Sequence, residues 1–229
     1  MTVQFEKLDN DLKTASAPYG VVAVSHRSGV YRNFFKRVLD VTAILLTLPV
    51  TLPVILLMGV LVARDGHNPF YRNNRVGRGG RDFKMLKLRT MVPDADKLLD
   101  AHLASDPDAK EEWRTTQKLK CDPRITKVGR FLRKTSLDEL PQIWNVLVGD
   151  MSLVGPRPML PAQRALYPGL SYYFLRPGIT GRWQVSERND SEFCKRAEHD
   201  HEYDAELSFT NDVKYLIRTV GVVLKGTGY

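Results

Sequence analysis

One stretch of the sequence restricts the possible folds more than any other, the uncharged apolar run Val41–Ala63. It has 23 residues, and a helix needs about 20 apolar residues to cross the hydrocarbon core of a bilayer. Pro49 and Pro53 lie near its centre, and a proline inside a helix removes a backbone hydrogen bond at a cost of about 3 kcal/mol or more. The run therefore predicts a membrane helix that is bent or broken in its middle, with Pro49 and Pro53 as the hinge.

Basic residues on both sides of this run indicate how it would lie in a membrane. Three precede it closely, and the segment Arg64–Met91 after it carries eight Lys and Arg residues against two Asp. Basic flanks prefer the cytoplasmic side, and a re-entrant hairpin over residues 31–64 keeps both flanks there. Each arm, Val38–Thr47 or Val54–Ala63, has ten residues and spans roughly 15 Å, about half of the hydrocarbon thickness. A kinked single span and a buried helix of a soluble protein are the alternatives.

The remaining chain divides into a short lead and one larger domain. Residues 1–30 show no sustained periodicity and predict a mobile N-terminal lead. Residues 65–229 mix helical patterns with a few short strands, which predicts an α+β domain. The glycines of 77–80 predict a tight turn between two strands rather than a phosphate-binding loop. Asp106, followed by a proline, predicts the start of a helix.

Charge and cysteine content narrow the partners and the compartment. The net charge of +8 indicates an anionic partner, namely nucleic acid, an anionic membrane face or a phosphorylated substrate. Cys121 and Cys194 lie far apart without C-x-x-C spacing, which argues against a disulfide framework or a zinc site and fits a reducing compartment. We expect both cysteines to be buried structural thiols.

The densest group of chemically active residues lies in 129–158. Apolar residues at helical spacing, with Gly149 as a stop, predict a helix that begins around Asp138–Glu139. In the simplest interpretation, Ser136, Asp138 and Glu139 only cap this helix. However, several basic residues surround the acids, namely Arg130, Arg133 and Lys134 before them and Arg157 between two prolines after them. Adjacent carboxylates among arginines suit a divalent cation and a polyphosphate, because a carboxylate can ligate Mg²⁺ and an arginine can bind two phosphate oxygens at once.

Three segments resemble the signature blocks of a known family. They are "KLRTM", "GRFLRKTSLDELPQIWNVLVGDMSLVGPRP" and "RPGITGRWQV". They are similar to the bacterial sugar transferase family, the monotopic polyprenyl-phosphate phosphoglycosyl transferases that begin exopolysaccharide assembly, and the match runs from about Lys36 to the C-terminus. The resemblance implies a proline-broken re-entrant helix and interfacial amphipathic helices, which hold a small catalytic domain on the cytoplasmic face of the bacterial inner membrane.

The resemblance also implies a reaction. A sugar 1-phosphate passes from a UDP-sugar to undecaprenyl phosphate with release of UMP, and galactose or glucose 1-phosphate is the expected group. Asp138 matches the aspartate that attacks the β-phosphorus and forms a covalent phospho-sugar enzyme. Glu139 matches its partner in metal or proton handling, so both residues are candidates for binding Mg²⁺. Splitting one displacement into two keeps nucleotide and lipid from occupying the site together.

Further residues are candidates for contacts with the substrates. We expect contacts from basic or conformationally restricted positions in the family motifs and from one acid near the end of the chain: Lys87, Arg89, Arg133, Pro156, Arg157, Pro158, Arg176 and Asp212. Each basic residue could instead be an ordinary solvated surface charge. The last helix carries Val213, Leu216, Ile217, Val220 and Leu224 along one side, which fits an interfacial helix and, nearly as well, core packing.

At the hinge the chain departs from the family pattern. Leu52 stands before Pro53, where family members often have a serine whose hydroxyl bonds a freed carbonyl. The bonding at the hinge must therefore differ from that of such members.

Two rival hypotheses remain at this point. One is a basic membrane-attached protein that binds an anionic ligand or nucleic acid, and the other is a membrane-tethered hydrolase that uses Asp138. We expect membrane lipid and no nucleic acid as partners, because no aromatic stacking platform accompanies the basic segment. A homodimer is compatible with the sequence.

Overall fold

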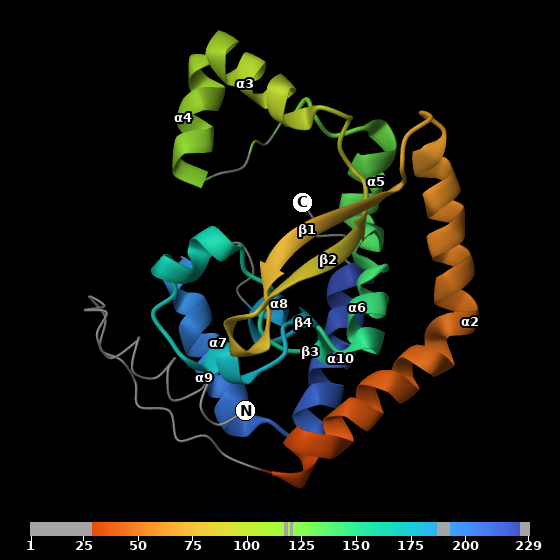
Figure 1. Cartoon of the computed structure of the whole chain (residues 1–229), viewed down its shortest axis with the longest axis vertical. Helices are drawn as coiled ribbons and strands as arrows, with labels where there is room; N and C mark the ends of the chain where they lie inside the picture. The colour runs from red at the N-terminus through yellow and green to blue at the C-terminus, as the bar shows by residue number, and fades with distance from the viewer. Residues whose placement is uncertain (1–28, 117–118, 120, 187–192, 225–229) are drawn as a thin grey trace. The chain divides into compact units, whose positions relative to one another are not determined.

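The computed structural model describes residues 29–116, 119, 121–186 and 193–224 (Figure 1). Residues 1–28 of the predicted mobile lead lie outside the described residues. Over these described residues the architecture is α+β, as predicted: helices predominate, and two two-stranded sheets accompany them. The chain divides into two compact units. The first takes in Met1–Thr47, Asn73–Met85 and Gln142–Val222, and the second Leu48–Arg72, Leu86–Pro141 and Val223–Tyr229, as far as these are described.

The apolar run forms one uninterrupted helix, α2 (Lys36–Ala63), which comes after a π-helical turn, η1 (Tyr31–Phe35). Both Pro49 and Pro53 lie inside it. Among the described residues, Tyr31–Ala63 is the one helix long and apolar enough to cross a membrane, and only 17% of its most apolar window is buried. A soluble core helix would be mostly buried, so α2 indicates association with a membrane. The helix is continuous where the sequence predicts two separate arms, and a re-entrant hairpin is not shown.

A β-hairpin comes next in the chain. Strands β1 (Phe70–Val76) and β2 (Asp82–Leu88) pair with each other and are joined by the short helical turn η2 (Arg78–Gly80). Gly79 and Gly80 have φ angles of 70° and 74°, a left-handed conformation that glycine adopts without steric cost. The predicted glycine turn between two strands is therefore confirmed.

The first unit is built around a short parallel sheet. Strands β3 (Ser152–Val154) and β4 (Gly178–Thr180) pair in the register Ser152↔Gly178. The helices and helical turns of this part of the chain are α6 (Gln142–Val148), η4 (Pro161–Leu166), α7 (Ser171–Phe174), α8 (Arg182–Val185), η5 (Phe193–Lys195), α9 (Arg196–Glu206) and α10 (Phe209–Leu224). Val154 packs in one buried cluster with Leu175, Tyr203 and Tyr215. This cluster joins the sheet to α9 and α10.

The last helix divides its apolar residues between core and surface. In α10, Leu216 packs against the buried cluster that contains Tyr203 and Tyr215, whereas Ile217 and Val220 are exposed. The side chain of Leu224 lies outside the described residues. One part of its apolar surface therefore packs inward and another faces outward, and the interfacial position predicted for this helix stays a prediction.

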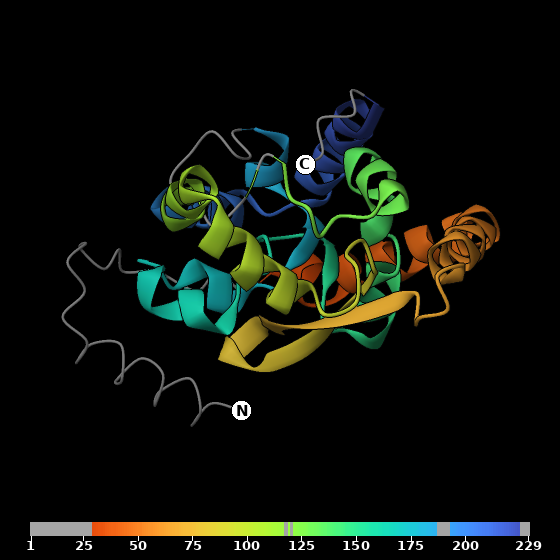
Figure 2. The same ribbon diagram turned by 90° about the horizontal axis from the view of Figure 1, so that it is seen from above.

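The second unit contains the end of α2, the end of β2 and the segment up to Pro141. Its helices are α3 (Ala95–Ser105), α4 (Pro107–Thr116), α5 (Lys127–Thr135) and the 3₁₀ turn η3 (Leu137–Glu139). Helices α3 and α4 lie side by side in both views (Figures 1 and 2). Asp106 accepts hydrogen bonds from the backbone N–H groups of Asp108 and Ala109, each at 3.0 Å. It therefore caps α4, as predicted.

A small apolar core holds the second unit together. Val62 of α2, Leu88 of β2 and Leu132 of α5 are buried against one another, and Leu137 of η3 packs on them. This core brings the end of the membrane helix, the end of the strand and the turn η3 into direct contact. Because Asp138 and Glu139 come directly after Leu137, the same core fixes the position of the acidic pair.

The predicted burial of the two cysteines is wrong. Cys121 is exposed, and Cys194 is half-buried. Cys121 lies in the irregular segment after α4, and Cys194 lies in the short turn η5. Short connections of this kind mostly run over the surface of a protein, so the general preference of free cysteine for the interior does not apply to them.

Candidate active site

The two adjacent acids lie in a short 3₁₀ turn rather than at the start of a long helix. Ser136 has φ 57°, and this left-handed residue ends α5. The turn η3 comes next with Asp138 and Glu139 in it, and α6 begins only at Gln142. The predicted start at Asp138–Glu139 and the role of Asp138 as N-cap are therefore wrong. Gly149, with φ 94°, lies directly after the end of α6, which confirms the predicted stop.

Lys87 is in direct contact with the acids. Its Nζ lies 2.6 Å from Oε1 of Glu139 and 3.8 Å from Oδ2 of Asp138. Lys87 projects from β2, and its neighbour Leu88 belongs to the core on which η3 packs. The structure therefore brings together three of the residues that the sequence singled out, although 52 positions separate Lys87 from Glu139 in the chain.

Burial changes the acidity of Asp138. The residue is only 8% exposed, and burial raises the pKa of Asp138 to about 6, with a smaller rise from the charge of Glu139. The positive charges of Lys87 and Arg133 act in the opposite direction and lower the same pKa. Asp138 is therefore a carboxylate near neutral pH, held in an environment where its charge is poorly solvated, as expected of a reactive group.

Arg133 supports the site from α5. Its Nε donates a hydrogen bond of 2.9 Å to Oγ1 of Thr90, and burial lowers the pKa of Arg133 while the charge of Asp138 raises it. The backbone carbonyl of Thr90 also accepts a hydrogen bond of 3.0 Å from the N–H of Thr126, which caps α5. Gly129 permits this close approach, because a Cβ there would lie 2.0 Å from the carbonyl oxygen of Thr90. Sequence reasoning missed Thr90, although it belongs to the "KLRTM" block.

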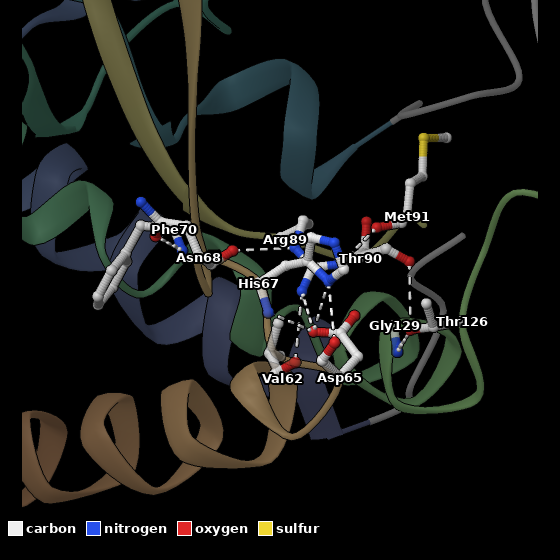
Figure 3. Close-up of polar contacts among 10 residues, drawn as sticks. All are labelled: Val62, Asp65, His67, Asn68, Phe70, Arg89, Thr90, Met91, Thr126 and Gly129. Carbon is white, nitrogen blue, oxygen red and sulfur yellow. Dashed lines mark hydrogen bonds and ion pairs between the residues drawn. The ribbon is translucent and has the colours of Figure 1, made fainter. Parts of the chain in front are cut away.

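Arg89 is surrounded by acceptors of the protein itself (Figure 3). Its guanidinium donates to Oδ1 of Asp65 at 2.6 Å and to the backbone carbonyls of Asn68 and Met91 at 2.9 and 3.1 Å. A longer bond of 3.4 Å reaches the carbonyl of Val62 near the end of α2. The substrate contact predicted for Arg89 stays a prediction.

Two of the predicted substrate contacts, Arg157 and Pro156, lie near Trp183 and β4 in the first unit. Arg157 is exposed, and its guanidinium lies 5.8 Å from the centroid of the Trp183 ring. Arg196, which sequence reasoning missed, lies 4.2 Å from the same centroid. The carbonyl of Pro156 accepts a hydrogen bond of 2.8 Å from the N–H of Gly178. A cation–π contact does not use the N–H donors of a guanidinium, so this contact with Trp183 leaves the donors of Arg157 available.

The other two predicted contacts of this region are tied into the fold. Nε of Arg176 donates a bond of 3.0 Å to the carbonyl of Gly149, directly after α6. The carbonyl of Pro158 accepts a long bond of 3.5 Å from Arg75. The roles predicted for Arg157, Arg176 and the two prolines stay predictions.

Asp212 is fully buried and bonded to protein donors. It accepts hydrogen bonds from Tyr31 at 2.6 Å, from Lys36 at 2.7 Å and from Tyr203 at 2.6 Å. Lys36 opens α2, so this network ties the start of the membrane helix to α9 and α10. The predicted contact between Asp212 and substrate stays a prediction, and the described geometry gives this carboxylate a structural task.

The acidic pair is compatible with magnesium. Mg²⁺ in phosphate-handling sites is usually held by one or two carboxylates together with substrate phosphates and water. Within the described ranges, no group of three or more His, Cys, Asp or Glu residues could hold a metal ion. Asp138 and Glu139 are two adjacent carboxylates of the kind that such a shared site uses, and their donor set fits the ion.

Comparison with known proteins defines the class of this chain. The model of the bacterial sugar transferase family matches residues 31–226. This range contains α2, the acidic pair and the whole set of predicted contacts. The chain therefore belongs to the bacterial sugar transferase family.

Individual relatives carry more specific names. The chain is 49% identical over 198 residues to a UDP-galactose-lipid carrier transferase of Erwinia amylovora, a match that covers 86% of this chain and 42% of that protein. It is 45% identical over 198 residues, with the same coverage, to the undecaprenyl-phosphate galactose phosphotransferase of Salmonella typhimurium. The chain thus spans less than half the length of these relatives. By contrast, a 40% match to the exopolysaccharide production protein ExoY of Rhizobium meliloti covers 94% of this chain and 97% of that protein.

Proposed function

We propose that this protein transfers galactose 1-phosphate from UDP-galactose to undecaprenyl phosphate and releases UMP, as the first membrane step of exopolysaccharide synthesis. The observation that carries the proposal is the buried Asp138 beside Glu139, with Lys87 in contact with Glu139. The names of the relatives from Erwinia amylovora and Salmonella typhimurium support the substrates. ExoY, which matches over nearly its full length, supports the pathway. Glucose 1-phosphate is the alternative group.

The proposed reaction proceeds in two displacements. An oxygen of the Asp138 carboxylate forms a bond to the β-phosphorus of the UDP-sugar, and the bond from this phosphorus to the bridging oxygen breaks, so that UMP leaves with the electron pair. A phosphate oxygen of undecaprenyl phosphate then attacks the same phosphorus. The bond to Asp138 breaks, and its carboxylate is regenerated. Two displacements allow nucleotide and lipid to use the site in turn.

The surrounding residues have distinct tasks in this proposal. Lys87 and Arg133 lower the pKa of Asp138 against the effect of burial, and thereby keep the attacking carboxylate ionised. Lys87 also orients Glu139 through the contact of 2.6 Å. Asp138 and Glu139 would hold magnesium, whose positive charge would offset the negative charge of the phosphate oxygens. Phosphoryl transfer depends mainly on such positioning and charge neutralisation.

The membrane placement is also a proposal. We place α2 as a re-entrant hairpin with its bend at Pro49 and Pro53, so that the protein is monotopic and its active site faces the cytoplasm at the bacterial inner membrane. Basic residues flank the apolar run on both sides, which disfavours moving either flank across. The exposed Phe209, Ile217 and Val220 of α10 support an interfacial position for that helix.

A defined assay tests the proposed function. The purified protein in lipid nanodiscs is mixed with UDP-galactose, undecaprenyl phosphate and Mg²⁺, and UMP is measured. We expect continuous UMP release that requires the lipid phosphate and the cation, with UDP-glucose compared in parallel. No UMP from either UDP-sugar, or steady release that is independent of undecaprenyl phosphate, would contradict the proposal.

A further inference from the structure

Arg89 connects the end of the membrane helix to the strand that carries Lys87 (Figure 3). Its guanidinium bonds Asp65 and the carbonyls of Val62, Asn68 and Met91. Its backbone N–H adds a bond of 2.8 Å to the carbonyl of Pro69. The contacts therefore reach both the last turn of α2 and the loop that leads from it into β1.

The guanidinium is suited to this task because its donors point in several fixed directions. Nε, Nη1 and Nη2 each bond a different group, a fork that a lysine ammonium cannot reproduce. The side chain of Arg89 is only 13% exposed, whereas that of Asp65 is 39% exposed. The bond to Arg89 lowers the pKa of Asp65 to about 2, so that this carboxylate stays ionised near neutral pH.

The neighbours of Arg89 in the sequence contact the acidic pair and its supports. Lys87 bonds Glu139, Leu88 is buried in the core that includes Val62, and Thr90 accepts a bond from Arg133. Four consecutive residues, 87–90, thus divide their contacts between the end of α2 and the surroundings of Asp138. A shift of this segment relative to the end of α2 would displace Lys87. It would also displace Arg133, because Arg133 is bonded to Thr90 of the segment.

We propose that Arg89 and Asp65 form a clamp that fixes the end of the membrane helix to the Lys87 segment, which makes Arg89 a positioning residue rather than a ligand of substrate phosphate. The clamp rests on the proposed function only for its effect on turnover. It gives the membrane helix a second task besides anchoring. The position of the helix end then determines the geometry of Lys87 beside Asp138 and Glu139.

Three variants test the clamp. Asp65→Asn removes the charged partner of Arg89, and Arg89→Lys keeps the positive charge but loses the fork. Arg64→Gln is the matched control, because it removes a charge from the exposed neighbouring position. Small displacements of catalytic groups cost up to about 10²-fold in rate. We expect both clamp variants to lose on the order of 10- to 100-fold in kcat, with KM for UDP-galactose nearly unchanged and Arg64→Gln at the wild-type level.

The division of the loss between kcat and KM separates positioning from substrate binding. If the clamp places Lys87, both variants lose kcat while KM for UDP-galactose stays nearly unchanged. A phosphate ligand would behave differently. In that case Asp65→Asn would keep its kcat, and Arg89→Lys would retain kcat with a raised KM. This second pattern would overturn the proposal.

Hydrogen exchange tests the clamp independently of the reaction. We expect faster amide exchange in residues 66–70 and 86–91 of Asp65→Asn and Arg89→Lys, and no change in Arg64→Gln. If the wild type releases no UMP, the proposed function fails, and the exchange result alone judges the clamp. Unchanged exchange in both clamp variants would overturn it.

Discussion

Nζ of Lys87 lies 2.6 Å from Oε1 of Glu139, and the same ammonium lies 3.8 Å from Oδ2 of Asp138. One half-buried cation therefore serves two adjacent acids, of which Asp138 has a pKa raised to about 6 by burial. Lys87 opposes that rise, because a nearby positive charge favours the carboxylate. The contact links the charge state of the proposed nucleophile to a single residue of β2.

Replacement of Lys87 should move the pH profile. Asp138 attacks only when it is ionised, so kcat/KM of the wild type should fall as the pH drops below about 6. In Lys87→Met the pKa of Asp138 rises further, and the acid limb should move to higher pH. Lys84→Met, at an exposed position of the same strand, is the control and should keep the wild-type limb. An unmoved limb in Lys87→Met would show that Lys87 does not act on Asp138.

The raised pKa of Asp138 also predicts how stability depends on pH. Between about pH 4 and 6 the folded state binds more protons than the unfolded state, so this residue makes the protein less stable as the pH rises through that range. Asp138→Asn removes the effect. It should raise the free energy of unfolding by up to about 3 kcal/mol at pH 8 and change it little at pH 4. Thermal unfolding of the wild type and of Asp138→Asn at both pH values measures this difference, with the exposed Asp100→Asn as control. An equal gain in the free energy of unfolding at both pH values would contradict the prediction.

The buried ion pair between Lys36 and Asp212 predicts that removal of the cation alone lowers the free energy of unfolding strongly, and that removal of the acid as well restores most of it. Lys36→Met leaves the fully buried Asp212 without its cation, which typically costs about 3–5 kcal/mol. The double variant with Asp212→Asn removes both charges and should recover most of the loss. Chemical unfolding followed by tryptophan fluorescence measures both, with exposed Lys110→Met as control. A double variant no more stable than Lys36→Met would show that the lost stability does not come from the uncompensated charge of Asp212.

Labelling of single cysteines tests the re-entrant arrangement of α2. In a Cys121→Ser, Cys194→Ser background, Gly29→Cys and Arg72→Cys mark the two flanks at exposed positions. We expect a membrane-impermeant maleimide to label neither site in intact spheroplasts and both after permeabilisation. Labelling of just one flank in intact cells would demonstrate a full span and exclude the hairpin.

Local patterns predicted the parts of the fold that depend on nearby residues. The glycine turn before β2, the cap at Asp106 and the stop at Gly149 each depend on conformational preferences within a few positions. The family motifs likewise singled out Asp138 and Glu139 as a pair and Lys87 as a candidate substrate contact, but their mutual contact appears only in the structure. At the turn, the cap and the stop, structure and sequence agree because the local conformational preference is compatible with the packing around it.

Long-range contacts explain the features that the sequence could not predict. Ser136 adopts a left-handed conformation that ends α5, and no local signal distinguishes it from the predicted capping residue. The sequence could not pair Arg89 with Asp65, because the two lie 24 positions apart and Asp65 belongs to no recognisable motif. The exposure of Cys121 depends on its place in an irregular connection rather than on its residue type.

The covalent intermediate on Asp138 is the central claim, and mass spectrometry of the trapped enzyme tests it most directly. The protein is incubated with UDP-galactose and Mg²⁺ without undecaprenyl phosphate, quenched and digested. We predict a hexose-phosphate adduct on the peptide that contains Asp138, its loss when undecaprenyl phosphate is added, and its absence in Asp138→Asn. An enzyme that turns over with lipid but never carries the adduct, or an Asp138→Asn variant that retains full turnover, would contradict the proposed mechanism.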